Sequence, residues 1–281
     1  MEGKDLYNEV SIRCSRLTTK AYSTSFSLGI LCLGSALRDP IYSIYGFVRF
    51  GDEIVDTFHE SDKNYLLKKF REDTYEAIEQ RISLNPILQS FQLVVNKFGI
   101  ERPVIEQFLK SMEMDLEMKV HDQESYKEYI LGSAEVVGLM CLRVFCNGDD
   151  QLYQKLKPSA MMLGSAFQKI NFLRDLNADF NGMGRMYFPG VDLTNFDQHT
   201  KKLIEQDIAN DFQQGLEGIC QLPRSARFGV YVAYVYYKAL LNKIMNTPAH
   251  RVVASRIRIR NRHKLRLLFT CFVRHRLNLI G

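Results

Sequence analysis

The sequence has no tryptophan, and its six cysteines include no pair spaced as Cys-x-x-Cys. No histidines are clustered with the spacing of metal ligands. These absences exclude a cysteine–histidine zinc finger and a Cys-x-x-Cys redox site. We therefore expect reduced thiols, most of them in the core of a cytoplasmic protein.

Long apolar runs are also scarce. The longest nearly uncharged run, FGVYVAYVYY at 228–237, is shorter than the roughly 20 residues that cross a bilayer. The N-terminal stretch MEGKDLYNEV lacks the apolar segment of a signal peptide, and no anchoring helix is expected at the other end. The sequence predicts a cytoplasmic protein, soluble or peripheral at the inner face of the membrane.

Acidic residues are missing from the last part of the chain. From Ala249 onward there are eight arginines and one lysine but no aspartate or glutamate. Because the whole chain carries +5, this tail at +9 leaves −4 on the rest. A basic tail on a mildly acidic body indicates an anionic partner: a phosphate ligand, an anionic lipid or a nucleic acid.

What is present is apolar spacing typical of helices. The composition, 46% hydrophobic and 25% charged, is that of a globular protein. No regular alternation of strands and helices occurs, so we predict one all-α domain over residues 1–281. Asp39 with Pro40, and Asn85 with Pro86, are expected to start helices. The expected helices cover 8–22, 38–56, 85–98, 101–120, 125–145, 159–180, 201–219 and 226–245, whereas 256–262 could be extended.

Two aspartates stand four residues apart in the apolar stretch RFGDEIVDTF at 49–58. In a helix Asp52 and Asp56 share a face and repel each other. Neighbours such as Phe47 and Ile54 indicate a buried face or a cleft, where the cost is larger. A solvated face is the alternative for any acidic helix. A cation would turn the repulsion into attraction, and carboxylate oxygens are ligands that Mg²⁺ prefers.

The pattern recurs in NFLRDLNADF at 171–180. Asp175 and Asp179 are again four apart in an apolar helix, and Asn171 precedes them by one turn. Gln168 extends this polar stripe, and an arginine stands near each acidic pair: Arg49 and Arg174. Two facing helices of this kind would hold two or three Mg²⁺ ions and, with the arginines, a diphosphate.

The apolar surroundings suit a long hydrocarbon tail on that diphosphate. Such a ligand is a prenyl diphosphate, which reacts by ionising to an allylic cation. Bound Mg²⁺ would stabilise the departing diphosphate as a Lewis acid. A dry aromatic cavity would keep water from the cation.

Four segments resemble the squalene/phytoene synthase family. YSTSFSLGILCL at 22–33 resembles its His-Ser-x-Ser-Phe opening. IYSIYGFVRFGDEIVD at 41–56 resembles its Tyr-x-x-x-Arg-x-x-Asp-x-x-x-Asp motif. YILGSAEVVGLMCLRVF at 129–145 resembles its middle helix, and LGSAFQKINFLRDLNADFNGMGRMYFP at 163–189 resembles its second motif with the trailing Gly-Arg-x-Tyr-x-Pro. The segments follow the family's order, and YYKALLNKI and SRIRIRNRHKL are looser matches downstream.

The resemblance implies a single-domain isoprenoid-synthase helical bundle with a central cavity. It assigns catalytic roles to Tyr45, Arg49, Asp52, Asp56, Asp175 and Asp179. It implies metal ligation by Asp52, Asp56, Asn171, Asp175 and Asp179. The substrate-binding positions that it implies are Ser23, Ser25, Phe26, Tyr129, Gly138, Gln168, Asn171, Arg174, Arg185, Tyr187, Tyr237 and Arg256, where Tyr129 could also belong to the core.

Two positions depart from the family pattern. Tyr22 stands where the family usually has histidine, so a phosphate contact there is not carried over. Glu135 replaces a small residue in the middle helix. His59, His121 and His199 are interpreted as surface residues.

The family reaction is a head-to-head condensation of two prenyl diphosphates through a cyclopropylcarbinyl diphosphate. We favour 15-cis-phytoene synthase, a Mg²⁺-dependent prenyltransferase of carotenoid biosynthesis that joins two geranylgeranyl diphosphates. Mn²⁺ could substitute, and NADPH is not expected. Squalene or dehydrosqualene synthase, using two farnesyl diphosphates, is the alternative.

Other functional classes explain less of the sequence. The tail mixes basic and apolar residues at helical spacing, so it could lie on an anionic membrane surface or form a last core helix. A nucleic-acid-binding module would use the tail but not the four aspartates. A non-catalytic scaffold would not need intact acidic pairs, and a terpene cyclase usually has an Asn/Ser/Glu second motif.

Overall fold

The computed structural model describes residues 3–118, 120–179 and 184–277. Over these residues there is no β-strand, only an isolated bridge between Val120 and Met186, so the prediction of an all-α protein is confirmed. The helices are α1 (Gly3–Tyr22), α2 (Thr24–Leu31), α3 (Ser35–Asp56), α4 (Lys63–Gln80), α5 (Pro86–Phe98), α6 (Arg102–Glu117), α7 (Gln123–Ile130), the π-helix η1 (Leu131–Glu135), α8 (Val136–Cys146), α9 (Asp150–Ala178), the 3-10 helix η3 (Leu193–Asn195), α10 (Gln198–Gln221), α11 (Arg224–Met245), α12 (Ala249–Ala254) and α13 (Asn261–Arg276).

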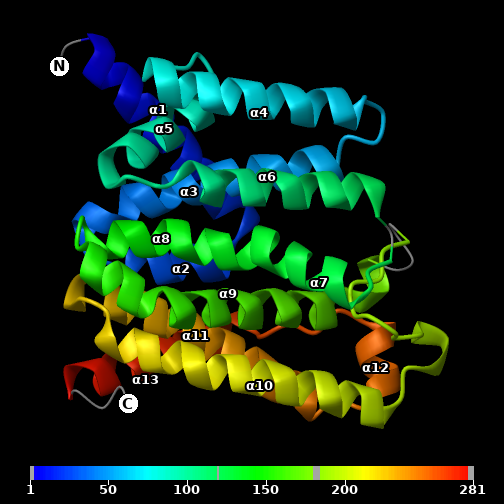
Figure 1. Cartoon of the computed structure of the whole chain (residues 1–281). Helices are drawn as coiled ribbons and strands as arrows, with labels where there is room; N and C mark the ends of the chain where they lie inside the picture. Colours follow the sequence, from blue (N-terminus) through cyan, green and yellow to red (C-terminus); the bar gives the residue numbers. More distant parts are fainter. Residues whose placement is uncertain (1–2, 119, 180–183, 278–281) are drawn as a thin grey trace.

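The long helices lie side by side as a bundle (Figure 1). At one end of the bundle, on the right in Figure 1, α6 and α9 reach their C-terminal ends and α7 begins. At the opposite end α8 finishes and α9 and α11 begin. The two ends therefore gather different side chains, and this difference positions the site.

Helix starts follow the capping rules in part. Asn85 accepts hydrogen bonds from the amides of Ile87 and Leu88 with Pro86 in the first turn, as predicted. The predicted start at Asp39 is wrong, because α3 already begins at Ser35. Leu37 is buried, so the apolar face of α3 continues one turn further than the Asp-Pro signal indicates.

Helix α4 is absent from the expected helices although its signal is present. Leu67, Phe70, Thr74 and Ala77 are buried along one stripe at helical spacing. Residues 256–260 are not helical, in agreement with the extended interpretation of 256–262, but Asn261 and Arg262 already belong to α13. Phe180, at the end of the expected helix 159–180, lies outside the described residues.

The buried residues form two large clusters. One cluster joins α3, α4, α5, α6 and α8, with Phe47 stacked on Phe91 at 3.8 Å between ring centroids. The other joins α9, α10, α11 and α13. That all of this forms one domain over residues 1–281 stays a prediction.

One segment of the described chain, Gln123–Cys146, is long and apolar enough to cross a membrane by length and composition alone. This segment is not among the long apolar runs noted from the sequence, of which FGVYVAYVYY is the longest nearly uncharged one. Since 56% of its most apolar window is buried inside the protein, we interpret it as a core segment made of α7, η1 and α8.

Candidate functional site

An elongated, largely apolar cavity of about 490 Å³ lies inside the bundle. Each surrounding helix turns one face toward it, at spacings of three and four residues. Helix α9, for example, contributes Leu156, Ser159, Ala160, Leu163, Gly164, Phe167, Gln168, Asn171 and Arg174. The central cavity implied by the family resemblance is therefore present.

The cavity is long and has two unlike ends. On the lining face of α9, Arg174 follows Leu156 by 18 positions, which corresponds to about 27 Å of helix. The end near Leu156 is closed by other apolar residues, namely Leu33, Phe145 and Leu222. The other end carries Arg49, Asp52, Asn171, Arg174 and Arg256. The space is thus shaped for a ligand with one anionic head and a long apolar tail.

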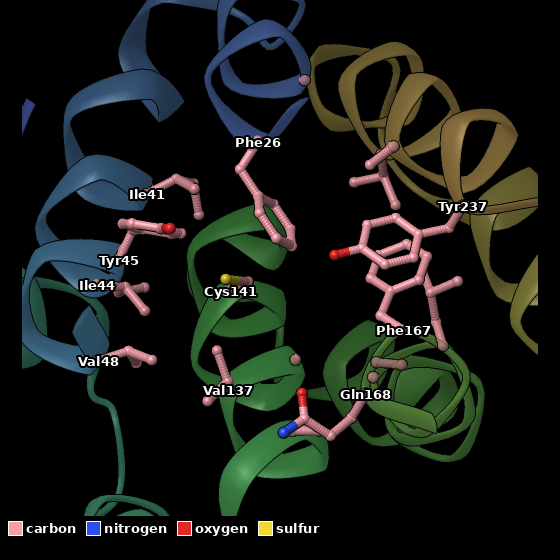
Figure 2. Close-up of a pocket in the computed structure, with 18 of the residues that line it drawn as sticks. Phe26, Ile41, Ile44, Tyr45, Val48, Val137, Cys141, Phe167, Gln168 and Tyr237 are labelled. Atoms are coloured by element: carbon pink, nitrogen blue, oxygen red, sulfur yellow. The ribbon is translucent and has the colours of Figure 1, made fainter. Parts of the chain in front are cut away.

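Aromatic rings surround the cavity next to its polar end (Figure 2). Phe26 lies 5.8 Å from Tyr45 and 5.9 Å from Tyr237 between ring centroids, and Phe167 stacks on Tyr237 at 4.1 Å. Burial, with the nearby Asp52 carboxylate second, raises the pKa of Tyr45 to about 12. These rings stay neutral at physiological pH, and their faces can stabilise a cation by cation–π attraction.

The acids of α3 stand at the polar end. Burial first, and the like charge of Asp56 second, raise the pKa of Asp52 to about 8. Arg49 lies 3.8 Å from Asp52 and pairs more closely with Glu53. The ring of Tyr22 covers the Arg49 guanidinium at 4.3 Å, so the residue that replaces the family's histidine packs on an arginine of the site.

The acids of α9 face those of α3. Arg174 contacts Asp175 at 2.5 Å and Arg256 contacts it at 2.7 Å. The pKa of Asp179 is raised to about 7 by burial, by Asp175 and then by Asp56 across the site. The fold therefore brings the two acidic pairs, which are distant in sequence, within electrostatic reach of each other.

Amide and hydroxyl groups complete the polar end. Asn171 donates to the Gln168 side-chain oxygen at 3.3 Å, and the Tyr237 hydroxyl donates to Asn171 at 3.3 Å. All three residues line the cavity. Ser23 lines it too and caps α2 by accepting from the Phe26 amide at 3.2 Å.

The donor set is suited to Mg²⁺ by its chemistry, although its present arrangement is not a finished metal site. In the part of the chain that the structure describes, no three of His, Cys, Asp and Glu are grouped so that they could hold a metal ion as they stand. Arg185 pairs with Asp56 at 2.6 Å, and Arg174 and Arg256 pair with Asp175. The raised pKa values of Asp52 and Asp179 come partly from neighbouring like charges. A divalent cation would relieve this repulsion, so the residues fit Mg²⁺ bound with a diphosphate.

One functional residue is missing from the sequence prediction. Asp115 of α6 has a side chain only 4% exposed and accepts from the Tyr129 hydroxyl at 2.8 Å and the Tyr187 hydroxyl at 3.2 Å. Arg185 lies 3.7 Å from it and also reaches Asp56. Asp115 thus joins the segment after α9 to the acidic end of α3.

A sequence signal for Asp115 does exist. It continues the buried stripe of Ile105, Phe108 and Met112 on α6, where an acid needs a partner. His121, interpreted above as a surface residue, belongs to the same group: it is 3% exposed and its ring lies 5.6 Å from that of Tyr187. The surface interpretation of His121 is therefore wrong.

Several predicted residues lie beside the cavity rather than along it. Of the described residues, Arg185 and Tyr187 belong to the buried Asp115 group and do not line the cavity. Tyr129 belongs to the same group and also lines the cavity. Ser25 lines a second, more polar groove of about 410 Å³. This groove shares five residues with the cavity: Tyr22, Ser23, Arg174, Tyr237 and Arg256. Asp56, Asp175 and Asp179 stand next to the cavity mouth without being part of its lining.

Gly138 of α8 and Glu135 of η1 are the two remaining positions noted from the sequence. Gly138 lines the cavity, and a Cβ there would approach the Ala160 carbonyl oxygen to 2.9 Å, so glycine allows α8 and α9 to pack closely. Glu135, which departs from the family pattern, accepts a 2.5 Å hydrogen bond from the Ser165 hydroxyl. It is absent from the lining of the cavity.

The raised pKa values predict how the metal-free protein responds to pH. In the fold Asp52 and Asp179 have pKa values of about 8 and about 7, above their ordinary 3.8. Between about pH 4 and pH 8 the folded state therefore binds more protons than the unfolded chain. As a result, the free energy of unfolding falls as pH rises through this range. Denaturant unfolding at pH 5 and pH 8, with and without Mg²⁺, measures this. Mg²⁺ is expected to stabilise the protein at pH 8 more than at pH 5, and equal effects would contradict the assignment.

Sequence comparisons agree with this geometry. A model of the squalene/phytoene synthase family matches residues 19–263. The chain is 27% identical over 268 residues to the 15-cis-phytoene synthase of Synechococcus elongatus, and the match covers 84% of each protein. It is 28% identical over 176 residues to the presqualene diphosphate synthase of Rhodopseudomonas palustris, and that match covers 60% of this chain and 59% of the relative.

Solved structures share the fold at low identity. A dehydrosqualene synthase in complex with a ligand superposes with a TM-score of 0.81 at 20% identity, covering 95% of this chain and 96% of its own. A squalene synthase from Alicyclobacillus acidocaldarius gives 0.74 at 19% identity, covering 90% and 97%. At these identities the likeness concerns the fold alone, and it confirms the isoprenoid-synthase helical bundle.

Proposed function

The chain belongs to the squalene/phytoene synthase family, whose members are prenyltransferase-type enzymes, and on that premise we propose that it condenses two geranylgeranyl diphosphates into 15-cis-phytoene. The observation that carries the proposal is the cavity. It runs along about 27 Å of helix α9 with a mainly apolar lining, and its acids and arginines are gathered at one end only. We further propose that Mg²⁺ is the cofactor, with Mn²⁺ able to replace it, and that NADPH is not used.

Binding of the diphosphates rests on the polar end of the cavity. Arg49, Arg174 and Arg256 are placed for charge-assisted hydrogen bonds to phosphate oxygens. Asp52, Asp56, Asp175 and Asp179, with Asn171, would hold the metal ions. Bound Mg²⁺ would supply Lewis-acid stabilisation of the charge that develops on the leaving diphosphate. For Asp175 to bind Mg²⁺, Arg174 and Arg256, which both line the cavity, would exchange this carboxylate for phosphate oxygens. Asp56 would likewise turn from Arg185 toward the metal.

Ionisation of the first substrate gives an allylic cation beside the aromatic rings. Phe26, Tyr45 and Phe167 present a neutral, water-poor wall to this cation. The C2–C3 alkene of the second substrate attacks it and closes a cyclopropane, so one diphosphate and one proton are released. The resulting cyclopropylcarbinyl diphosphate ionises in turn, rearranges, and loses its diphosphate and a second proton to give the C40 hydrocarbon.

The preference for C20 substrates is supported by the relatives. Matches to the phytoene synthases of Arthrospira platensis and Synechococcus elongatus run along 83% and 84% of this chain. Squalene or dehydrosqualene synthase is the second candidate, favoured by the names of the structural neighbours. In that case two farnesyl diphosphates would react, and the final step of squalene formation would take a hydride from NADPH.

A product assay decides between these candidates. The purified protein is incubated with Mg²⁺ and either geranylgeranyl or farnesyl diphosphate, with and without NADPH. A C40 hydrocarbon formed without NADPH is the expected result. A C30 hydrocarbon, or a C30 cyclopropylcarbinyl diphosphate as the end product, would overturn the choice of substrate. No condensation with either substrate would overturn the proposed reaction.

Chain-length preference is expected to depend on the closed end of the cavity. Phe26 lies at the aromatic end near the acids, whereas Leu156 and Phe145 close the far end. Leu156→Phe should shorten the space and lower kcat/KM for the C20 substrate relative to the C15 substrate by roughly tenfold or more. Phe145→Ala is the matched variant, since it enlarges the same end and should shift the ratio toward C20. Identical shifts in both variants would contradict this placement.

A further inference from the structure

Helix α13 packs on the body by one face only. Cys271 is buried, Leu267 and Leu268 are partly buried against the core, and the Lys264 carbonyl accepts from the Tyr236 hydroxyl at 2.9 Å. In Figure 1 this helix lies at the lower edge of the bundle, beside α11. Its opposite face is therefore available to something outside the protein.

That opposite face carries apolar side chains together with arginines. Five large apolar side chains along it are exposed at spacings that form one helical stripe. They are Leu265 (61% exposed), Phe269 (69%), Val273 (38%), Leu277 (63%) and, at the border where its ring meets Phe228 of α11, Phe272 (45%). Isolated exposed apolar residues are ordinary, but a continuous stripe on one helix marks an interaction surface.

Positive charge lies among and beside these apolar side chains without any acid to balance it. Arg262, Arg266, Arg274 and Arg276 are exposed on the same helix. No aspartate or glutamate occurs after Ala249. The neighbouring N-terminal end of α11 adds Arg224 and Arg227, whose charges, after burial, lower the pKa of His275. A partner of this surface must offer both negative charge and an apolar layer.

We propose that α13 docks this protein on an anionic lipid surface. An interfacial helix buries its apolar stripe at the boundary between headgroups and acyl chains, while arginines meet lipid phosphates. The benefit to catalysis rests on the proposed function, since prenyl tails and a C40 product are insoluble in water. The packed face of the same helix borders the polar groove beside the cavity, where Lys264 donates to Thr24 of α2 at 3.1 Å.

A second copy of the chain suits this surface less well. A two-fold contact through α13 would place the two basic segments face to face, and the segment has no acid to pair with them. A nucleic acid would satisfy the arginines but would leave the exposed Phe269 and Leu265 without a partner. A bilayer with acidic headgroups meets both requirements.

Vesicle co-sedimentation tests the proposal with the full-length protein and no substrate. The vesicles are phosphatidylcholine alone or phosphatidylcholine mixed with phosphatidylglycerol. We expect binding only to the mixed vesicles, weakened by added salt. The double variant Leu265→Ser/Phe269→Ser should bind roughly 30-fold more weakly. The control is Leu84→Ser, which removes a 93% exposed leucine between α4 and α5 and should bind as the wild type does.

A charge variant separates attraction from apolar insertion. Arg266→Glu/Arg274→Glu should lose roughly 25-fold or more in affinity for the mixed vesicles, since each basic residue near an anionic surface contributes about fivefold. All variants change exposed side chains, and thermal unfolding verifies that they fold. Turnover of dispersed substrate should be unchanged in them, so failure of docking is distinguishable from failure of the proposed reaction.

The proposal would be overturned by equal binding to both kinds of vesicle, by wild-type binding of Leu265→Ser/Phe269→Ser, or by sedimentation velocity showing that this variant only breaks a dimer. Tight, sequence-independent binding to RNA with no binding to vesicles would point to a nucleic acid and would likewise overturn it.

Discussion

Asp52→Asn is expected to fold normally and to lose roughly 100-fold to 1000-fold in kcat, which corresponds to about 3–4 kcal/mol of transition-state stabilisation. The carboxylate stands at the polar end of the cavity, where its charge is needed for the metal that would stabilise the leaving diphosphate. In the metal-free protein the same charge is unfavourable, because burial and Asp56 raise its pKa to about 8. The variant should therefore be at least as stable as the wild type at pH 8 without Mg²⁺ while being a much poorer enzyme.

Asp73→Asn is the matched control for this prediction. The Asp73 side chain is 33% exposed and that of Asp52 is 34% exposed, but Asp73 lies on α4 in a surface ion pair with Lys69. The control should retain wild-type turnover. The Mg²⁺ concentration that gives half-maximal activity should rise in Asp52→Asn and stay constant in Asp73→Asn. Wild-type turnover in Asp52→Asn at saturating Mg²⁺ would remove Asp52 from the metal site.

The two acidic pairs should behave as one unit. Asp56 contributes to the raised pKa of Asp179, so the charges of α3 and α9 already act on each other without metal. The double variant Asp52→Asn/Asp179→Asn should therefore cost much less in kcat than the product of the two single losses. Independent, multiplicative losses would indicate separate sites instead.

The sequence predicts the fold well where local rules act alone. Apolar spacing predicts most long helices, and Asn85 with Pro86 starts α5 as the capping rules require. The same rules fail at Asp39 and Pro40, because burial of Leu37 lengthens α3 toward its N-terminus. Pro40 is the sixth residue of α3, where proline removes one backbone hydrogen bond and crowds the preceding turn, so the packing of this face must offset that cost.

The site is predicted to the extent that its residues repeat a spacing. The Asp-x-x-x-Asp pairs identify Asp52, Asp56, Asp175 and Asp179, and the fold brings them into range of each other. Spacing could not reveal how deep the cavity is, because its far end is lined by side chains from α8, from α9 and from the segments that follow α2 and α10. Nor could spacing reveal that an acid on α6 meets an arginine beyond α9, since that contact exists only after the helices pack.

Replacing Arg185 by methionine is expected to give the largest loss of stability. The Arg185 side chain is 8% exposed and lies 2.6 Å from Asp56 and 3.7 Å from Asp115, and the Asp115 side chain is 4% exposed. Removing one partner of a buried pair leaves the other charge without compensation, which costs about 3–5 kcal/mol. The measurement is denaturant unfolding of Arg185→Met. The contrasting variant is Arg71→Met, whose partners Glu106 and Glu113 have side chains 46% and 41% exposed, and there we expect a loss of less than about 1 kcal/mol.

A second substitution identifies Asp115 as the origin of that loss. Burial already raises the pKa of Asp115 to about 6 although Arg185 opposes the shift. Without Arg185 this pKa must rise further, so the defect of Arg185→Met should be small near pH 4 and grow as pH increases through neutrality. Adding Asp115→Asn removes the uncompensated charge while keeping an oxygen for the Tyr129 hydroxyl, and it should restore most of the stability at pH 8. If the double variant is no more stable than Arg185→Met, the loss comes from Asp56 or from packing around Tyr187, and Asp115 does not hold this segment in place.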